Sequence, residues 1–407
     1  MSDCHWEADV AGVDHTDIVI VGAGYAGMAA AVEFQKHHTP FTLLNKHDYH
    51  YFKTLLHEAA GGRADLSNFA IAIEDVVRDP MAKFLKTNVV MINPNEHLIE
   101  TSAGILSYSK LMIALGGQTA FFRIPGLKEH SLVLNTLEDS KRIRRHIESK
   151  VMSYSQTEDS TLLRFVIGGG GLTGVELMGE LADFLPRLLE ENDINRDRLE
   201  LILVHSHDDI VPGIDQKLRD IVKDKLLERK VKLLLNERVI EAKPCAVVLS
   251  GGETIHTQTF IWAGGVSANP VLESSGFSVD QRGRAIVNEH LQSVDHPDVY
   301  IVGDCAHYKD KTGVVVPQTG QVAEQMGQHA AKNVIAALHG KHQKPFVYRH
   351  HGLAVSLGPH YGVAEVGHLR TSGFAALALK DGSKAKYLMH LGGIHALIYK
   401  RKQWIHV

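Results

Sequence analysis

The chain has 407 residues, 44% of them hydrophobic, which is enough for two domains that each bury a core. Its formal net charge of −4 at pH 7 offers no overall positive field for phosphates, which argues against nucleic acid as the main partner. The three cysteines, Cys4, Cys245 and Cys305, form no C-x-x-C pair, so we expect neither a disulfide framework nor a metal site. The N-terminus is polar and acidic, and no apolar run reaches the roughly 18 residues of a membrane span, so we expect no secretory signal and no transmembrane helix.

The first clear element is "DIVIVGAGYAGMAAAVEFQK", which predicts a buried strand at 17–21, a glycine-rich turn and an alanine-rich helix. In this G-x-G-x-x-G pattern the first glycine makes the tight turn, the second lets the backbone approach a pyrophosphate, and the third lets helix and strand pack closely. The N-terminus of the helix adds N–H groups and a positive dipole. The pattern predicts a dinucleotide site at Gly22, Gly24, Tyr25, Ala26 and Gly27.

A second copy of the pattern lies about 150 residues later, in "LLRFVIGGGGLTGVELMGELADFL". It predicts a second dinucleotide site at Gly169, Gly171, Thr173 and Gly174. Glu176 falls in the first turn of the following helix, where an acid can also simply complement the helix dipole. At the end of the next strand, the position that commonly carries an acid for the NAD ribose holds His205.

A duplicated dinucleotide fold with "VYIVGDCA" near residue 304 resembles the flavoprotein pyridine-nucleotide oxidoreductases. The resemblance implies FAD in the first site, NAD(P)H in the second, and Asp304 with Gly303 at the flavin ribitol. It also implies crossover segments at 111–117 and 260–270, the latter containing Gly264.

We therefore predict an α/β protein with two Rossmann-like dinucleotide-binding domains, the pyridine-nucleotide-disulfide-reductase-like fold, and a C-terminal membrane-associating segment. The predicted boundaries are 1–118 and 267–348 for the FAD domain, 119–266 for the NAD(P)H domain, and 349–407 for the C-terminal region.

The stretch "LLNKHDYHYFKTLLHEAAGG" is more specific and resembles the type II NADH dehydrogenases, which are single-subunit, FAD-containing NADH:quinone oxidoreductases that do not pump protons. Many Rossmann flavoproteins end this strand in an acid, whereas here it ends in Asn45 and Lys46, as in that family, so both belong to the implied FAD site. The segments "IPGLKEH", "WAGGV" and "GDCA" agree in order and spacing. The resemblance covers about residues 16 to 400.

The helix expected at 317–340 carries the family's glutamine pattern, with Gly320 in place of its first alanine, and the resemblance implies that Gly320 and Gln321 also contact FAD. Gln321 and Gln325 are four residues apart and share a helix face, so the resemblance implies that their amides bind a quinone carbonyl. Solvated glutamines on a helix are the alternative. For Glu176 the family implies a place facing the nicotinamide. We expect hydride transfer from NADH to FAD, followed by two electrons to membrane menaquinone or ubiquinone.

The C-terminal segment carries seven Lys or Arg from Arg370 onward against one acid, Asp381, a net charge of +6. With Tyr399 and Trp404 this composition predicts helices lying on an anionic membrane surface, and hence a peripheral, monotopic protein on the cytoplasmic face of the cell membrane. A solvated cationic tail is the alternative. Lys386 corresponds to a family lysine near flavin and quinone. Whether the chain forms a homodimer stays open.

Three other functions stay open at this point. A sulfide:quinone oxidoreductase shares the architecture but needs a redox-active cysteine pair, which Cys245 and Cys305 do not supply. An NADPH-dependent flavoprotein reductase is suggested by His205, which could admit a 2′-phosphate. A redox-sensing protein would hold FAD and NAD(P)H as signals, but needs neither a quinone pocket nor a membrane surface.

Overall fold

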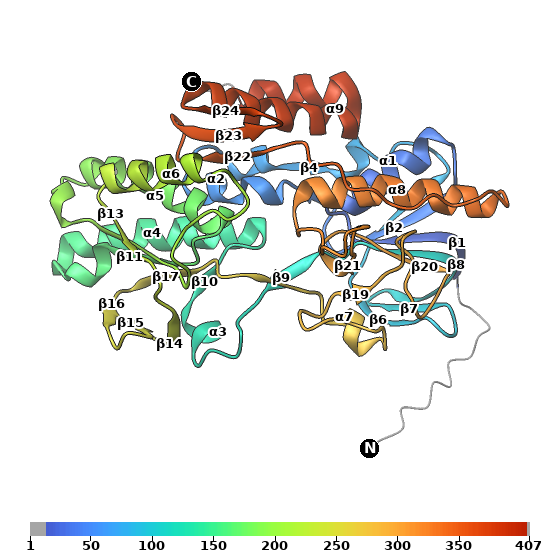
Figure 1. The fold of residues 1–407 in the computed structure, drawn as a ribbon, viewed down its shortest axis with the longest axis horizontal. Helices are drawn as coiled ribbons and strands as arrows, with labels where there is room; N and C mark the ends of the chain where they lie inside the picture. Colours follow the sequence, from blue (N-terminus) through green and yellow to red (C-terminus); the bar gives the residue numbers. More distant parts are fainter. Residues whose placement is uncertain (1–13, 405–407) are drawn as a thin grey trace, which may run out of the picture. The chain divides into compact units, whose positions relative to one another are not determined.

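The structure, a computed structural model, describes the backbone of residues 14–404 and the side chains of residues 14–393. The chain divides into two compact units (Figure 1). The first unit comprises the residues up to His50, Ala72–Gly117 and Ala268–Tyr348, and the second comprises Tyr51–Ile71, Gln118–Ser267 and Arg349–Val407. The segments 51–71 and 349–407 therefore belong to the same unit as 118–267. The assignment of a cofactor to each predicted domain remains a prediction.

The first unit is built on a mixed seven-stranded sheet in which β1 lies between two parallel neighbours, as its uninterrupted apolar sequence predicts. The strand order is β5 (Ala82–Lys86), β2 (Phe41–Asn45), β1 (Asp14–Val21), β8 (Gly104–Ile113), β7 (Leu98–Thr101) and β6 (Val89–Asn93), with β20 (Val299–Ile301) also pairing with β8. The strands β6, β7 and β8 pair antiparallel, whereas β20 is parallel to β8.

Two helices of this unit, α1 (Tyr25–Lys36) and α8 (Gly320–Leu338), pack against one another. A Cβ atom on Gly327 would lie only 2.0 Å from the carbonyl oxygen of Ala26, so the glycine permits this close approach. The helix α8 was expected to begin near Pro317. It begins at Gly320 instead, because the Thr319 hydroxyl accepts a hydrogen bond from the N–H of Val322 and caps the helix there.

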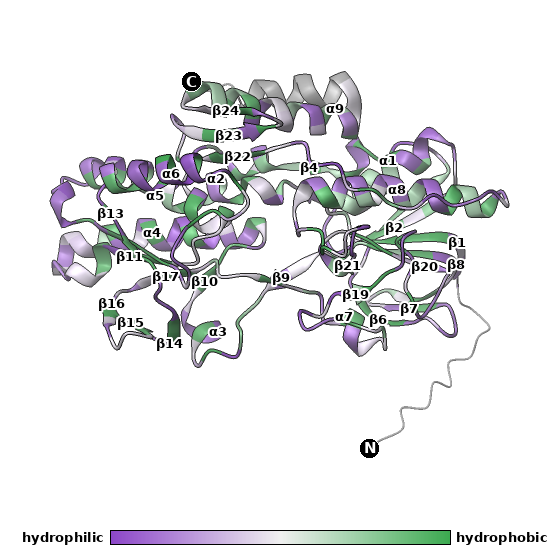
Figure 2. Cartoon of the chain, in the orientation of Figure 1, coloured by the Kyte–Doolittle hydropathy of each residue, from purple (hydrophilic) through white to green (hydrophobic). Residues whose placement is uncertain are grey.

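The second unit contains a five-stranded sheet in which every neighbouring pair is parallel. Its order is β10 (Leu132–Val133), β17 (Thr259–Trp262), β11 (Arg164–Gly168), β12 (Glu200–Val204) and β13 (Val231–Leu234). The unit also contains α4 (Leu137–Thr157), α5 (Leu172–Glu191), α6 (Gln216–Glu228) and an antiparallel sheet of β14 (Val239–Lys243), β15 (Ala246–Leu249) and β16 (Thr254–His256). Figure 2 shows hydrophobic and hydrophilic residues mixed along α4, α5 and α6, as expected for helices with one buried face.

The C-terminal part of the second unit is an antiparallel sheet followed by a helix. Its elements are β22 (Leu353–Ser356), β23 (Gly362–Val366), β24 (Leu369–Ser372) and α9 (Phe374–Trp404). The helix α9 is interrupted at Gly392 and Gly393, whose backbone angles are not helical. Within the described part of the chain, none of the helices combines the length and apolar composition needed to cross a bilayer.

The remaining strands and α-helices are short and connect those above. They are β3 (Tyr49–Tyr51), α2 (Leu56–Ala60), β4 (Ala70–Ala72), β9 (Gly117–Thr119), α3 (Leu127–His130), β18 (Val266–Ala268), α7 (Val271–Ser274), β19 (Ala285–Ile286) and β21 (Ala306–His307). The helix α2 matters for the site because it contacts α5 inside the second unit.

Candidate functional site

Both glycine-rich turns have the same geometry. In the first unit Gly22 has φ +100°, and a Cβ atom on Gly27 would lie 1.8 Å from the carbonyl oxygen of Gly22. A Cβ atom on Gly24, between them, would meet nothing within 4 Å. The backbone thus requires two of the three glycines, while the third faces open space that a phosphate group can use.

The second turn repeats this arrangement in the second unit. Gly169 has φ +124°, a Cβ atom on Gly174 would lie 1.9 Å from the Gly169 carbonyl oxygen, and one on Gly171 would meet nothing within 4 Å. The N-cap residues of α1 and α5 are Gly24 and Gly171, and neither offers a side-chain cap. Each unit therefore presents a helix N-terminus suited to an anionic group.

In each unit the second residue of the turn is tied to the end of the next strand. The N–H of Ala23 donates to the Asn45 side-chain oxygen (3.1 Å), and the N–H of Gly170 donates to Nδ1 of His205 (3.0 Å). Asn45 also donates its amide N–H to the carbonyl of His47 (2.8 Å). Asn45 and His205 thus occupy equivalent places in the two copies of the fold, which the sequence pattern alone did not reveal.

His50 is a residue that the sequence analysis missed. It is buried, and its Nδ1 donates to the carbonyl of Ala23 in the first glycine-rich turn (2.8 Å). Burial lowers the pKa of His50 to about 4, so the ring is neutral at pH 7. Lys46, which the sequence places in the predicted FAD site, is exposed.

The G-D segment lies beside α1 and α8 in the first unit. A Cβ atom on Gly303 would be 3.4 Å from the Cβ of Ala26 and 3.3 Å from that of Ala323. Gln318, just before α8, donates its amide to the carbonyl of Asp304 (2.9 Å). The predicted FAD residues that the first unit contains are Gly22, Gly24, Tyr25, Ala26, Gly27, Asn45, Lys46, Gly303, Asp304, Gly320 and Gln321.

The glutamine pair of α8 also belongs to the first unit. Gln321 and Gln325 are both partly buried, and the Oε1 atom of Gln321 accepts a hydrogen bond from the hydroxyl of Tyr348 (2.7 Å). Gln321 is therefore held by a partner in this unit, so its orientation is not left to solvent. Its predicted role toward a quinone remains a proposal.

The predicted nicotinamide residues lie in the second unit: Gly169, Gly171, Thr173, Gly174, Glu176, His205 and Gly264. Glu176 is 8% exposed and is surrounded by polar groups from three other elements. Its Oε1 atom accepts from Nζ of Lys380 on α9 (2.5 Å) and from the N–H of Ser356 on β22 (3.1 Å). Nδ1 of His57 on α2 lies 3.6 Å from its Oε2 atom.

The electrostatics of this cluster keep Glu176 charged. Burial alone would raise the pKa of the Glu176 carboxyl, but the electrostatic interactions with His57 and Lys380 and the hydrogen bonds from Lys380 and Ser356 outweigh burial and leave the pKa below its ordinary value. Burial lowers the pKa of His57 to about 3, which makes its ring neutral at pH 7. Sequence reasoning missed His57, Ser356 and Lys380, although "LLHEAAGG" was already a marked motif.

Comparison with known proteins identifies the family. The model of the pyridine nucleotide-disulphide oxidoreductase family matches residues 16–327. The chain is 30% identical over 402 residues to a "Type II NADH:quinone oxidoreductase" of Staphylococcus saprophyticus, covering 96% of this chain and 99% of the relative. The chain belongs to the type II NADH:quinone oxidoreductases. A protein of the same name from Staphylococcus aureus (strain MW2) is 29% identical with the same coverage.

Solved structures share the fold of this type II NADH:quinone oxidoreductase. NDH2 from Plasmodium falciparum, solved in complex with NADH, superposes with a TM-score of 0.86 at 17% identity, covering 96% of this chain and 97% of that one. The sulfide:quinone oxidoreductase of Aquifex aeolicus gives 0.76 at 19% identity, covering 94% and 92%. The predicted α/β fold class with parallel sheets is thus confirmed.

The described residues include two free cysteines, one in each unit. Cys305 is buried, and burial, with the charge of Asp304 adding to it, raises the pKa of its thiol to about 12. Its Sγ atom donates to the carbonyl of Gly116 (3.2 Å). A thiol held protonated in this way is a poor nucleophile, and Cys245 belongs to the other unit. Cys4 lies outside the described residues.

Two predictions for the C-terminal region stay predictions. Lys386, the predicted flavin lysine, is an exposed residue of the second unit, and its predicted role is not tested by its position. The basic and aromatic residues Tyr399, Lys400, Arg401, Lys402 and Trp404 have side chains outside the described range. Among residues 14–393, no group of three or more His, Cys, Asp or Glu is placed to hold a metal ion.

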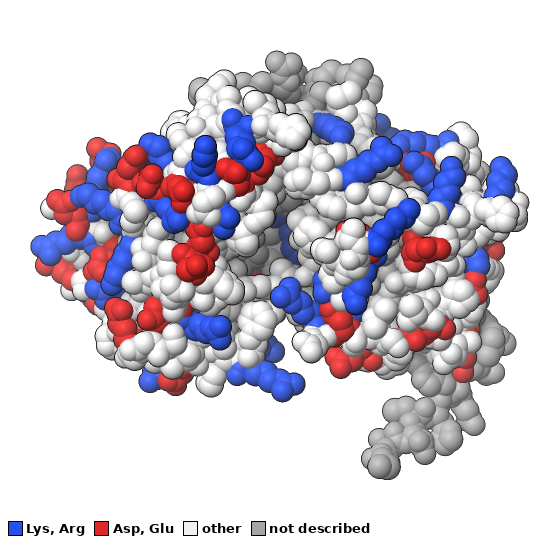
Figure 3. Space-filling model, viewed as in Figure 1, with Lys and Arg blue, Asp and Glu red and all other residues white. Residues whose placement is uncertain are grey.

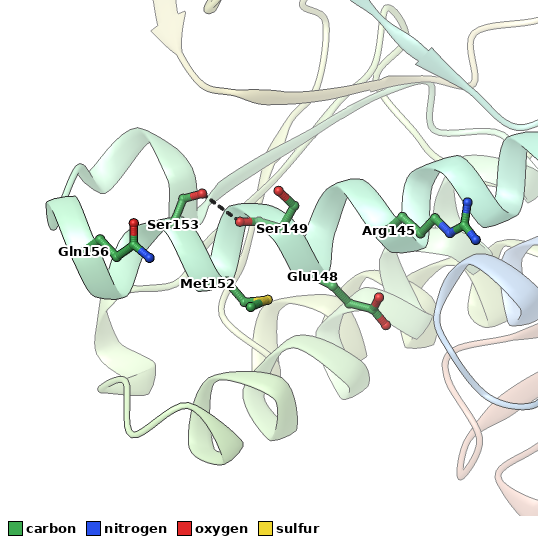
Figure 4. Close-up of a pocket in the computed structure, with 6 residues that line it drawn as sticks. All are labelled: Arg145, Glu148, Ser149, Met152, Ser153 and Gln156. Atoms are coloured by element: carbon green, nitrogen blue, oxygen red, sulfur yellow. Dashed lines mark hydrogen bonds between the residues drawn. The ribbon is translucent and has the colours of Figure 1, made fainter.

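The surface of the second unit carries mixed charges and a pocket on one helix. Figure 3 shows acidic and basic side chains interspersed over the second unit, at the left of the view. A surface pocket is lined by one face of α4 alone (Figure 4). Its lining residues are Arg145, Glu148, Ser149, Met152, Ser153 and Gln156. A pocket lined by a single helix brings together no groups from separate elements, so we assign it no function.

Proposed function

We propose that the chain oxidises NADH and passes two electrons to a quinone. The observation that carries the proposal is a 402-residue alignment with relatives of that name, in a chain that has two glycine-rich turns with one open glycine each. The open glycines, Gly24 and Gly171, fit the pyrophosphate groups of two dinucleotides, FAD in the first unit and NADH in the second. When bound, FAD would supply the redox chemistry between NADH and the quinone, which takes up two electrons and two protons to form the quinol.

The residues of this chain bind and orient the reactants. Asn45 holds the first glycine-rich turn through its hydrogen bond with Ala23, and His205 holds the second through Gly170. Glu176 is a fixed negative charge for the nicotinamide end of NADH. Gln321 and Gln325 offer amide groups that bind a quinone carbonyl.

The lipid-soluble substrate requires access to a membrane. We propose that α9 lies on an anionic bilayer surface at the cytoplasmic face of the cell membrane, as the cationic composition beyond residue 370 suggests. The acceptor is then menaquinone or ubiquinone. A homodimer is compatible with the proposal but not required by it.

The quinone site is tested by steady-state turnover of the purified FAD-loaded protein with NADH and a short-chain quinone, comparing wild type with Gln321→Leu. Loss of one amide hydrogen bond of about 1 kcal/mol predicts a kcat/KM for quinone lower by about three- to tenfold. Anaerobic flavin reduction by NADH should stay at the wild-type rate, because Gln321 lies outside the predicted nicotinamide residues. The FAD content of each preparation is measured alongside, because Gln321 is also a predicted FAD residue.

The matched control is Tyr348→Phe, which removes the hydroxyl that donates to Gln321 but keeps the glutamine amide. If Tyr348→Phe and Gln321→Leu lower quinone turnover equally, the amide acts by holding the local structure and the quinone role is wrong. If wild type oxidises NADH but transfers no electrons to any quinone, the proposed acceptor class fails.

A further inference from the structure

The helix α9 inserts two lysines, one turn apart, into the interior of the second unit. The side chains of Lys380 and Lys384 are only 12% and 13% exposed. Each meets a buried carboxylate: Lys380 contacts Glu176 of α5 (2.5 Å), and Lys384 contacts Glu58 of α2 (2.7 Å). Lysines are almost never buried unless they are paired, so these two contacts hold α9 at a defined place on this unit.

The ammonium group of Lys380 has three hydrogen-bond acceptors, one for each of its N–H bonds. Its three partners are Oε1 of Glu176 (2.5 Å), Oγ of Ser356 (2.6 Å) and Nε2 of His57 (3.2 Å). They come from α5, β22 and α2, so the position of the ammonium is set from three directions. Because Nε2 of His57 accepts from Lys380, the proton of the neutral ring lies on Nδ1, the atom that faces Glu176.

Glu176 depends on this lysine. It is 8% exposed, and a buried carboxylate without a positive partner is strongly unfavourable. His57 does not replace the charge, since burial keeps its ring neutral at pH 7. Of the contacts that Glu176 makes with the described residues, the one with Lys380 brings an ammonium group within hydrogen-bonding distance of the carboxylate.

We propose that Lys380 is a positioning residue of the nicotinamide site, holding Glu176 ionised and oriented, so that the site is complete only when α9 is docked on the second unit. The inference rests on the proposed function and on the proposed role of Glu176. Since α9 is also the proposed membrane-associating helix, one element serves the coenzyme site and the lipid surface.

Lys384 provides a matched control on the same helix. It is as buried as Lys380 and pairs with Glu58, which also lies 3.4 Å from Arg63. No contact joins Lys384 to Glu176 among those of the described residues. Lys384→Gln therefore breaks a buried ion pair of α9 without touching the proposed coenzyme residue.

The test measures anaerobic flavin absorbance in the FAD-loaded protein as a function of NADH concentration, giving an apparent Kd and a limiting reduction rate. The variants are Lys380→Gln, Glu176→Gln, the double variant, Lys380→Arg and Lys384→Gln, with thermal unfolding measured separately. We expect Lys380→Gln and Glu176→Gln each to reduce the limiting rate of flavin reduction divided by the apparent Kd for NADH by about tenfold.

The double variant should be no worse than either single variant, because Lys380 acts through Glu176. Lys380→Arg should lose less of this ratio than Lys380→Gln does, since arginine keeps the positive charge. Lys384→Gln should lower the unfolding temperature but leave both NADH constants within about twofold of wild type.

Two results would overturn the inference: equal NADH defects in Lys380→Gln and Lys384→Gln, or single-variant effects that multiply in the double variant. If Lys380→Gln does not fold, Lys380→Arg and the double variant, which leaves no unpaired charge, decide instead. Failure of the proposed function is distinguishable, because the flavin of the wild-type protein would then not be reduced by NADH.

Discussion

The environment of His205 bears on the choice between NADH and NADPH. Its Nδ1 accepts the N–H of Gly170, so the proton of the neutral ring is on Nε2. Burial, with the charge of His207 adding to it, lowers the pKa of His205 and favours the neutral form. A neutral donor replaces the acid that commonly binds the NAD ribose, so no negative charge at this position repels the 2′-phosphate of NADPH.

We predict that His205→Glu increases discrimination against NADPH. The carboxylate can accept the Gly170 N–H as Nδ1 does, but it repels a 2′-phosphate, so kcat/KM for NADPH should fall about tenfold or more relative to NADH. Steady-state kinetics with each coenzyme measure the ratio. His207→Gln is the control, expected to change the ratio by less than about twofold. An unchanged ratio in His205→Glu would place the adenosine ribose elsewhere.

At the scale of elements, buried charged side chains connect α2, α5 and α9. One of them, Glu180, has an unusually high pKa. Glu180 of α5 pairs with Arg63, yet burial, with the negative charge of Glu58 adding to it, raises the pKa of Glu180 to about 7. The folded state therefore binds this proton more tightly than the unfolded state, in which the pKa is near 4.5. The stability contributed by Glu180 is fully present below pH 4.5 and is lost as pH rises through about 7.

We predict that Glu180→Gln removes this part of the pH dependence. Urea midpoints measured from about pH 5 to 8 should decline in wild type and decline less in the variant, since a neutral amide has no proton to lose. Glu190→Gln on the same helix is the control, because the Glu190 side chain is 69% exposed and should leave the slope unchanged. Equal slopes in wild type and Glu180→Gln would show that Glu180 is ionised throughout.

At the scale of the whole molecule, the structure divides the basic residues of the C-terminal region into two groups. Arg370 pairs with Asp215 and Glu365, and Lys380 and Lys384 pair with buried glutamates. These three basic residues are paired with acids of the protein itself, although in the sequence they count toward the net charge of +6. The proposed attraction to lipid therefore rests mainly on Lys386 and the basic group at 400–402.

We predict that replacing Lys400, Arg401 and Lys402 together by glutamine weakens binding to phosphatidylglycerol vesicles by about tenfold or more, since each basic residue near the surface contributes about 1 kcal/mol. Sedimentation with vesicles at low and high salt measures this, because screening weakens the interaction. Arg370→Gln should bind as wild type does. Equal binding of wild type to neutral phosphatidylcholine vesicles would contradict the electrostatic mechanism.

Much of the fold and part of the site could be predicted from the sequence. The strand, glycine-rich turn and helix at Gly22–Gly27 and at Gly169–Gly174 are encoded by neighbouring residues, because tight turns, close packing and helix starts depend on local spacing. The start of α8 was placed too early, since Pro317 suits a first helical turn but the Thr319 cap decides where the helix begins. The role of each site residue stays a prediction.

The sequence by itself determined the α/β class, the two dinucleotide turns and the family, because these rest on local patterns and their order along the chain. Only the tertiary structure decided which charged side chains are buried together. Lys380 and Glu176 are 204 residues apart, and in sequence both are ordinary charged residues on helices. Burial raises the cost of an unpaired charge, so their pairing becomes decisive only after α2, α5, β22 and α9 have packed.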